Sequence, residues 1–310
     1  LAYSTISHLG LITVLIGIGT PLAIVAAIFH ILNHATFKAS LFMAAGIIDH
    51  ETGTRDLRLL RGLRHKLPIT ATLAIVASAA MAGVPLLNGF LSKEMFFAET
   101  LHVGGERNWW MSYAAVAMGM FSVAYSLRFI SVFFGAPAQG LPRDPHEPPR
   151  WMRFPVELLV LACLVVGVAP AVSIEPLLHL AVVATLGEAA PAYDLAVWHG
   201  FNLPLAMSVC ALVGGVALYG VLRRHFDLAQ RERVPLIHRL NGAQAYETTM
   251  LQITRGAEWL LRRVGTRRLQ PQLMLMMVAL LLVPPLLAGA PPAWMAIALQ
   301  GFDPIFAGMW

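Results

Sequence analysis

The residues best suited to chemistry are two histidines and a lysine within a long apolar stretch: His30, His34 and Lys38. Apolar sequence surrounds them, from Leu9 to Ile31 and from Ala39 to Ile48. If this stretch is helical, the three side chains share one face and form a polar seam about 12 Å long. In a membrane such groups are costly, and they usually mark an ion or proton path. We therefore predict a proton relay here.

Two other interpretations of the seam remain open. His30 and His34 could be core histidines with satisfied hydrogen bonds, while Lys38 reaches a lipid headgroup. They could also be metal ligands, because histidines four residues apart bind zinc in some enzymes. A metal site needs a third ligand, and the sequence has no HExxH pattern. We therefore predict no metal and no other cofactor.

A second polar site interrupts an apolar segment at Gly83, Pro85 and Gly89, which cannot sustain a regular helix. Unwound backbone in a membrane is tolerated only inside protein or along a wet cavity, and broken helices build ion sites in many transporters. Lys93 would lie in the first turn of the second half-helix. The helix dipole and burial disfavour a positive charge there, which suits a group that releases protons. The alternative is a kinked helix whose Lys93 and Glu94 reach the far interface.

Composition places the chain among polytopic membrane proteins. It is 57% apolar and 13% charged, with a mean hydropathy of +0.67, whereas soluble domains are about 25% charged. We expect no nucleic-acid partner, since the net charge of +5 resides in loops. Cys163 and Cys210 lie in apolar runs without a CxxC pattern, which argues against a disulfide, a cluster or zinc. Because the chain begins with Leu1 and has no basic leader, we expect it to be the interior of a longer protein.

Hydropathy indicates seven apolar segments and the start of an eighth at 302–310. The seven lie at about 1–19, 21–48, 68–100, 109–134, 155–184, 201–222 and 272–287. Residues 223–270 are rich in arginine, and 244–264 have the apolar rhythm of an amphipathic helix, which could lie on the membrane surface or against a neighbouring protein. A solvated connector is the alternative.

The distribution of Lys and Arg predicts the orientation. Three polar segments, 49–66, 135–154 and 223–270, hold most of these residues, and alternation of the helices places all three on one side. The opposite side holds only Arg107. By the positive-inside rule the basic side is cytoplasmic.

Three motifs together resemble a known family of antiporter-like membrane subunits, shared by respiratory complex I and the multisubunit Mrp cation/proton antiporters. The motifs are AYSTISHLG at 2–10, HxxxHAxFKAxLF at 30–42 and GxPxxNGFxSKE at 83–94. The sequence HETGTRD at 50–56, and the continuation of the chain past the seventh segment, are more similar to the large A-type component of Mrp systems. One departure is His8, where the family usually has Gln; it could add a titratable group or substitute neutrally.

The resemblance implies an all-α transmembrane helix bundle with two inverted repeats, each containing a broken helix. Residues 1–184 would be the second repeat and the following helix of an antiporter-like domain. Residues 185–310 would add C-terminal transmembrane helices and a cytoplasmic amphipathic segment at 223–270. The family's relay residues fall on His30, His34, Lys38 and Lys93, and the helix break falls on Gly83, Pro85 and Gly89.

The resemblance implies a multi-pass subunit of a monovalent cation (Na⁺)/proton antiporter in the bacterial inner membrane, not an enzyme. Its partners would be other membrane subunits, the lipid bilayer, protons and a monovalent cation. The alternative is a proton-pumping subunit of an NADH-quinone oxidoreductase or membrane-bound hydrogenase. The chain has no GxGxxG loop and no cluster cysteines, so redox chemistry would reside in other subunits. A third possibility is a scaffold with vestigial polar residues.

Overall fold

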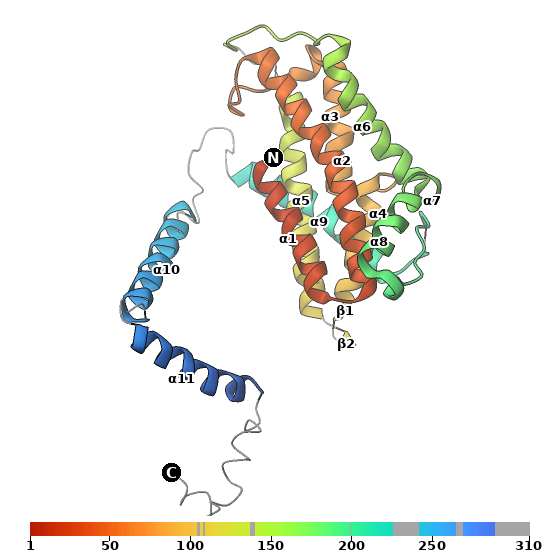
Figure 1. Cartoon of the computed structure of the whole chain (residues 1–310). Helices are drawn as coiled ribbons and strands as arrows, with labels where there is room; N and C mark the ends of the chain where they lie inside the picture. Colours follow the sequence, from red (N-terminus) through yellow and green to blue (C-terminus); the bar gives the residue numbers. More distant parts are fainter. Residues whose placement is uncertain are drawn as a thin grey trace, which may run out of the picture. The chain divides into compact units, whose positions relative to one another are not determined.

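In a computed structural model of the chain, the described residues are 1–103, 106–107, 109–136, 140–198, 200–225, 242–264 and 269–288 (Figure 1). The chain divides into two compact units, Leu1–Arg231 and Glu232–Trp310, which are considered separately. The regular structure is almost entirely helical, which confirms the predicted all-α class. Within the described residues, four helices are long and apolar enough to cross a membrane: Pro21–Thr52, Trp109–Phe133, Arg150–Val168 and Leu203–Arg224.

The first unit is a helix bundle with one small hairpin. Strands β1 (His102–Val103) and β2 (Glu106–Arg107) pair in antiparallel orientation, with His102 opposite Arg107. The α-helices are α1 (Ala2–Ile18), α2 (Pro21–Thr52), α3 (Pro68–Ala82), α4 (Asn88–Leu101), α5 (Trp109–Ile130), α6 (Arg150–Val168), α7 (Pro170–Ser173), α8 (Glu175–Leu186) and α9 (Leu203–His225). Three short 3₁₀-helices are η1 (Leu63–His65), η2 (Ser131–Phe133) and η3 (Gly187–Ala189).

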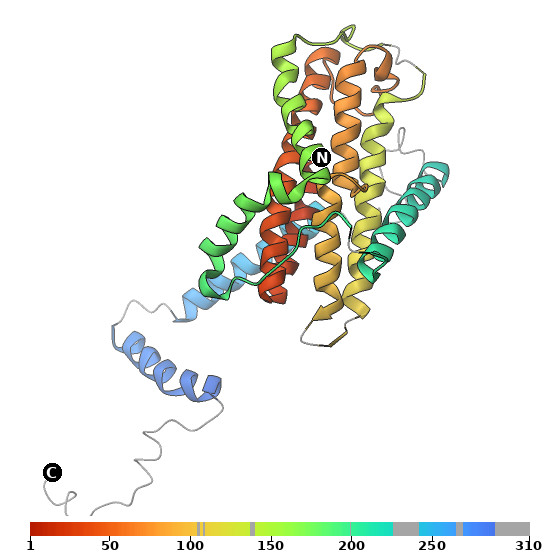
Figure 2. The ribbon, with the colours of Figure 1, turned by 90° about the vertical axis from the view of Figure 1, so that its right-hand side faces the viewer.

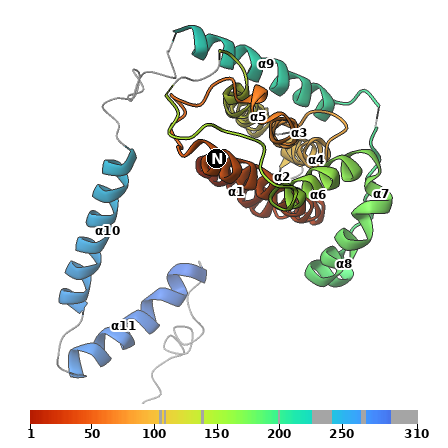
Figure 3. The same cartoon turned by 90° about the horizontal axis from the view of Figure 1, so that it is seen from above.

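Helix α2 is the centre of the bundle. Its N-terminus is capped by Thr20, whose Oγ1 accepts the N–H of Ala23 at 3.1 Å, and Pro21 occupies the first helical position, where a missing N–H costs nothing. The helix packs against α1, α3, α4 and α6, while α9 packs against α5 on the outside of the bundle (Figure 3). Polar groups on several faces of α2 are therefore buried by other helices, including those of His30 and Lys38.

The third predicted segment consists of two helices, as the prediction of a discontinuous helix requires. Helix α3 ends at Ala82 and α4 begins at Asn88, with a turn between them (Figure 2). Leu86 in that turn has φ +67°, which is unusual for a residue other than glycine.

The fifth predicted segment, 155–184, differs from the structure in two ways. Helix α6 begins at Arg150, so Pro155 lies inside the helix and not at its start. The segment is also divided at Ala169, where φ −133° and ψ 62° are not helical and Pro170 begins a new helix. The residue before a proline is biased away from the helical region, which explains this boundary.

Two of the basic segments and the first residues of the third meet at one end of the first unit. Lys66 Nζ lies 3.1 Å from Asp144 Oδ1, and the guanidinium of Arg143 donates to the carbonyl of His50 at 3.1 Å. Arg223, the first residue of the third segment, lines the same cavity as Arg61 of the first. This convergence agrees with the alternation that we inferred from the positions of Lys and Arg.

A glutamate from the loop before α6 caps helix α3. Glu147 Oε1 accepts the backbone N–H groups of Ile69 at 2.6 Å and of Thr70 at 2.9 Å, and Oε2 accepts the Thr70 hydroxyl at 3.0 Å. These N–H groups have no partner within the helix, and a carboxylate also interacts favourably with the positive end of the dipole. The contact ties the loop before α6 to the start of α3 at the basic end.

The second unit contains α10 (Gly242–Val264) and α11 (Leu269–Ala288). Helix α10 covers the predicted amphipathic helix at 244–264, and its apolar side chains Ile253, Trp259 and Leu261 are exposed in the chain. Residues 226–241, 265–268 and 302–310, on which parts of our predictions fall, lie outside the described residues.

Candidate functional site

The helical spacing of α2 places the predicted relay residues within the bundle. His30 and Lys38 are buried, and His34 is partly buried. The ring centroids of His30 and His34 are 6.2 Å apart. The fully buried ring of Phe37 packs edge-on against both, with centroid separations of 6.4 Å and 5.5 Å. The two histidines therefore lie on one face, as predicted, but the hydrogen bonds of His30 are made with other helices.

His30 is hydrogen bonded on both ring nitrogens. Its Nε2 lies 3.0 Å from Nδ1 of His8, on α1, and its Nδ1 lies 3.0 Å from Oγ of Ser92, on α4. The rings of His8 and His30 are stacked, with centroids 5.2 Å apart. A neutral imidazole has one donor and one acceptor nitrogen, so a proton gained by one ring can be passed to the other through this contact.

His8 continues the contact towards α5. Its Nε2 lies 3.0 Å from the hydroxyl of Tyr125, and that hydroxyl lies 3.0 Å from Oγ of Ser122. Ser122 and Tyr125 are three residues apart on α5 and so share a face. Both groups are hydroxyls, which donate and accept at the same time.

Lys93 closes this series of contacts at the helix break. Its Nζ donates to Ser122 Oγ at 2.8 Å, to the carbonyl of Met81 at 2.8 Å and to the carbonyl of Ala82 at 2.9 Å. Met81 and Ala82 are the last residues of α3, whose final carbonyls have no N–H partner within the helix. The break therefore supplies the acceptors that a buried ammonium needs.

The two glycines of the break are required by geometry. Gly83 has φ +87°, a conformation that other residues rarely adopt, and a Cβ there would lie 2.9 Å from Cδ of Lys93. A Cβ on Gly89 would lie 1.8 Å from the carbonyl oxygen of Ala80, so α4 could not approach the end of α3 this closely. Pro85 is exposed in the turn between the helices.

Lys38 lies apart from this series. Its Nζ donates to Oγ of Ser4, on α1, and lies 3.8 Å from Sδ of Met81. Ser4 also lines a cavity of about 300 Å³ together with Ser7 and Tyr125. The partner of Lys38 and a member of the hydrogen-bonded series thus line one cavity.

His34 packs against neighbouring rings. Its centroid lies 5.1 Å from that of His8, and within the described part of the chain its Nε2 has no hydrogen-bond partner. Among the described residues no group of three His, Cys, Asp or Glu side chains is arranged to hold a metal ion.

The hydrogen-bonded series thus runs from His30 through His8, Tyr125 and Ser122 to Lys93. The motifs indicated its two ends. Tyr125 and Ser122 were not predicted, because their segment is rich in Ala, Ser and Met and carries no signal for a relay. Their spacing on one helical face was the only available cue.

Residues 1–122 match the family model described as the transmembrane region of NADH:quinone oxidoreductases and Mrp antiporters. The whole chain aligns, with 58% identity, to 31% of a probable K(+)/H(+) antiporter component, of the combined A/B type, from Rhizobium meliloti. The chain belongs to the family of antiporter-like membrane subunits. Its family relatives include the A-type component of the Na(+)/H(+) antiporter of Alkalihalophilus pseudofirmus, 34% identical over 91% of the chain and 38% of the relative.

Solved structures of the family agree with this placement. The Mrp complex from a Dietzia species has a chain with a TM-score of 0.64 and 33% identity, covering 97% of this chain and 31% of that one. Respiratory complex I from Thermus thermophilus has a chain with a TM-score of 0.52 and 25% identity; the match covers 62% of this chain and 39% of that one. The protein is therefore a multi-pass membrane protein with the antiporter-like fold, and it spans about a third of the length of these relatives.

Proposed function

We propose that this chain forms part of the large subunit of a multisubunit monovalent cation/proton antiporter in a bacterial inner membrane, where it works with other membrane subunits. The relatives that match most of the chain are named as components of antiporters, one for potassium and one for sodium. The observation that carries the proposal is the hydrogen-bonded series that ends on Lys93 at the helix break.

Protons pass between His30 and Lys93 by exchange along this series. Each hydroxyl of Tyr125 and Ser122 accepts a proton on one side and releases one on the other. His8 transfers between its two nitrogens, so it acts as a member of the relay and not as a neutral substitute for the family's Gln. Lys93 is the terminal group: as an amine it accepts from Ser122, and as an ammonium it is held by two carbonyls.

Lys38 joins the relay through the cavity beside Ser4. A volume of about 300 Å³ accommodates several waters, since each occupies about 30 Å³ in the liquid, and Ser4, Ser7 and Tyr125 offer polar partners. His34, next to His8 and His30, adds a further basic group to the centre of the path. Positive charges on neighbouring groups repel, so a proton that arrives at one group drives another onward, and cation movement is coupled to this charge.

The division of the chain follows from this role. Residues 1–184 carry the relay as an antiporter-like transmembrane domain. Residues 185–310 supply C-terminal helices, with the amphipathic segment 223–270 on the cytoplasmic surface. The exposed apolar side chains of α10 support contact with lipid or with a neighbouring subunit.

The test uses the full-length protein in its complete complex, reconstituted in vesicles. Lys93→Met removes the titratable group, and Lys93→Arg keeps a positive charge that does not deprotonate. We expect both variants to lose proton exchange against Na⁺ and K⁺, while Lys66→Met, at an exposed loop lysine, retains it. Near wild-type exchange in either Lys93 variant would reject the terminal role of Lys93, and measuring both cations tests the sodium preference.

A second candidate function is a pump subunit of a redox-driven complex. The likeness to a chain of respiratory complex I favours it. Subunits that co-purify with the full-length protein separate the two: small hydrophobic proteins alone support the antiporter, whereas iron–sulfur or flavin proteins support the redox complex.

A further inference from the structure

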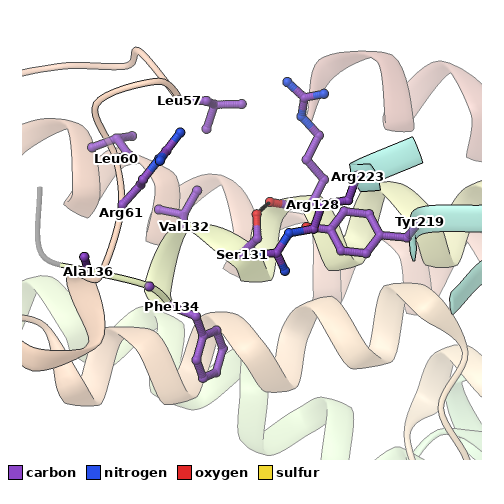
Figure 4. Close-up of a pocket in the computed structure, with 11 residues that line it drawn as sticks. Leu57, Leu60, Arg61, Arg128, Ser131, Val132, Phe134, Ala136, Tyr219 and Arg223 are labelled. Atoms are coloured by element: carbon purple, nitrogen blue, oxygen red, sulfur yellow. Dashed lines mark hydrogen bonds between the residues drawn. The ribbon is translucent and has the colours of Figure 1, made fainter. Parts of the chain in front are cut away.

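A cavity of about 350 Å³ lies at the basic end of the first unit, and none of the proposed relay residues lines it. Arginines from three elements line it: Arg61 from the loop after α2, Arg128 from the last turn of α5 and Arg223 from the last turns of α9 (Figure 4). Tyr219 of α9 lines the same space. No aspartate or glutamate is among the described residues that line it.

Guanidinium groups that line one cavity repel each other, and an anion bound between them removes this repulsion. Other basic residues at this end have acidic partners: Arg55 Nε lies 2.7 Å from Asp49, and Lys66 Nζ lies 3.1 Å from Asp144. Hydrogen bonds from the side chain and backbone of Arg58 hold the pKa of Asp56 below its ordinary value, so the carboxylate nearest to the cavity in sequence is already engaged. Within the described residues, Arg61 and Arg223 take part in no such pair.

The position of the cavity decides which anion fits. Arg128 and Arg223 lie near the ends of the candidate membrane spans Trp109–Phe133 and Leu203–Arg224. Arginines at the end of a span reach the headgroup layer, and in the orientation that the positive-inside rule predicts this end faces the cytoplasmic leaflet, which is rich in anionic lipids. The forked donors of arginine also match phosphate oxygens.

Apolar side chains also line the cavity, from Leu57, Leu60, Val132 and Phe134, next to the hydroxyl-bearing Ser131. A free phosphate ion gains nothing from such a wall, whereas the glycerol and first methylene groups of a phospholipid pack against it. A volume of about 350 Å³ is within the usual range for small-molecule pockets.

We propose that this arginine cavity binds the phosphate group of an anionic phospholipid and thereby anchors the loop after α2 and the end of α9 at the membrane surface. The proposal is independent of the relay. It predicts that the bound lipid stabilises the protein through Arg61 and Arg223 and not through the basic charge of this end in general.

The experiment measures the thermal stability of the purified full-length protein in its complex, in detergent, during titration with phosphatidylglycerol, phosphatidylcholine or inorganic phosphate. The test variant is Arg61→Gln with Arg223→Gln. The charge-matched control is Arg55→Gln with Arg150→Gln, two exposed arginines that do not line the cavity. Lipid retained by each variant is also counted by native mass spectrometry.

We expect phosphatidylglycerol, but not phosphatidylcholine, to raise the melting temperature of the wild type and of the control. The test variant should bind phosphatidylglycerol more weakly by about tenfold or more. Equal weakening in both double variants, or equal responses to the two lipids, would overturn the proposal. A response to inorganic phosphate with none to phosphatidylglycerol would overturn the lipid assignment in favour of a soluble anion.

Discussion

The substitution Tyr125→Phe separates the hydrogen-bonded relay from the packing around it. Phenylalanine keeps the ring and removes only the hydroxyl, which lies 3.0 Å from His8 Nε2 and 3.0 Å from Ser122 Oγ. Without that oxygen these two atoms are separated by up to about 6 Å, well beyond hydrogen-bond reach. The hydrogen-bonded route from His30 to Lys93 is then interrupted between His8 and Ser122.

The expected cost in stability is small. His8 retains its contact with His30 at 3.0 Å, and Ser122 retains Lys93 at 2.8 Å, so neither group loses every partner. Loss of the hydroxyl should cost about 1 kcal/mol of folding free energy. The effect on transport should exceed the effect on stability, because a proton must pass between His8 and Ser122 without a fixed hydroxyl to carry it. We expect exchange to fall by about tenfold or more, which corresponds to about 1.4 kcal/mol in the barrier.

The assay follows the collapse of a pH gradient by dye fluorescence in everted membrane vesicles after addition of Na⁺ or K⁺. The full-length protein is expressed in its complex, and its content is measured by immunoblot. Tyr113→Phe is the matched control, since Tyr113 is on the same helix with 65% of its surface exposed. If Tyr125→Phe retained more than half of the wild-type exchange at equal protein content, the relay could not depend on this hydroxyl.

Two further predictions concern the scaffold. Gly89→Ala should prevent the close approach of α4 to Ala80, destabilise the protein by about 1–3 kcal/mol and reduce its amount in the membrane; Gly10→Ala, whose added Cβ meets no atom within 4 Å, should not. Glu147→Ala should remove the cap of α3 and lower the stability of the protein by about 1 kcal/mol in thermal melts of the purified complex. The control Glu188→Ala, at an exposed site, should leave the melting temperature unchanged. Equal effects of the two substitutions would argue against the cap.

The sequence predicted those features of the fold that depend on local chemistry. Pro21 and Pro68 mark the starts of α2 and α3, and Gly83 lies directly after the end of α3, because these residues restrict the backbone wherever they occur. The division at Ala169 was not predicted: one proline in an apolar run kinks, ends or begins a helix according to what packs against it.

For the candidate site, local pattern indicated the charged residues but not their connections. His30 and Lys93 are 63 positions apart, and Tyr125 joins them only because α1, α4 and α5 meet inside the bundle. The arginine cavity has the same origin, since Arg61, Arg128 and Arg223 share no motif. Contacts between distant segments are set by tertiary packing, which the periodicity of apolar residues in the sequence does not reveal.

The two carbonyls that hold Lys93 make the helix break sensitive to charge. The Lys93 amine binds the two carbonyls at the end of α3, so in the proposed mechanism loss of its proton weakens the contact between α3 and α4, and return of the proton restores it. A change in the protonation of Lys93 would thereby change how the two half-helices pack. In that mechanism the turn that begins at Gly83, between α3 and α4, is the point at which the two half-helices would move relative to each other.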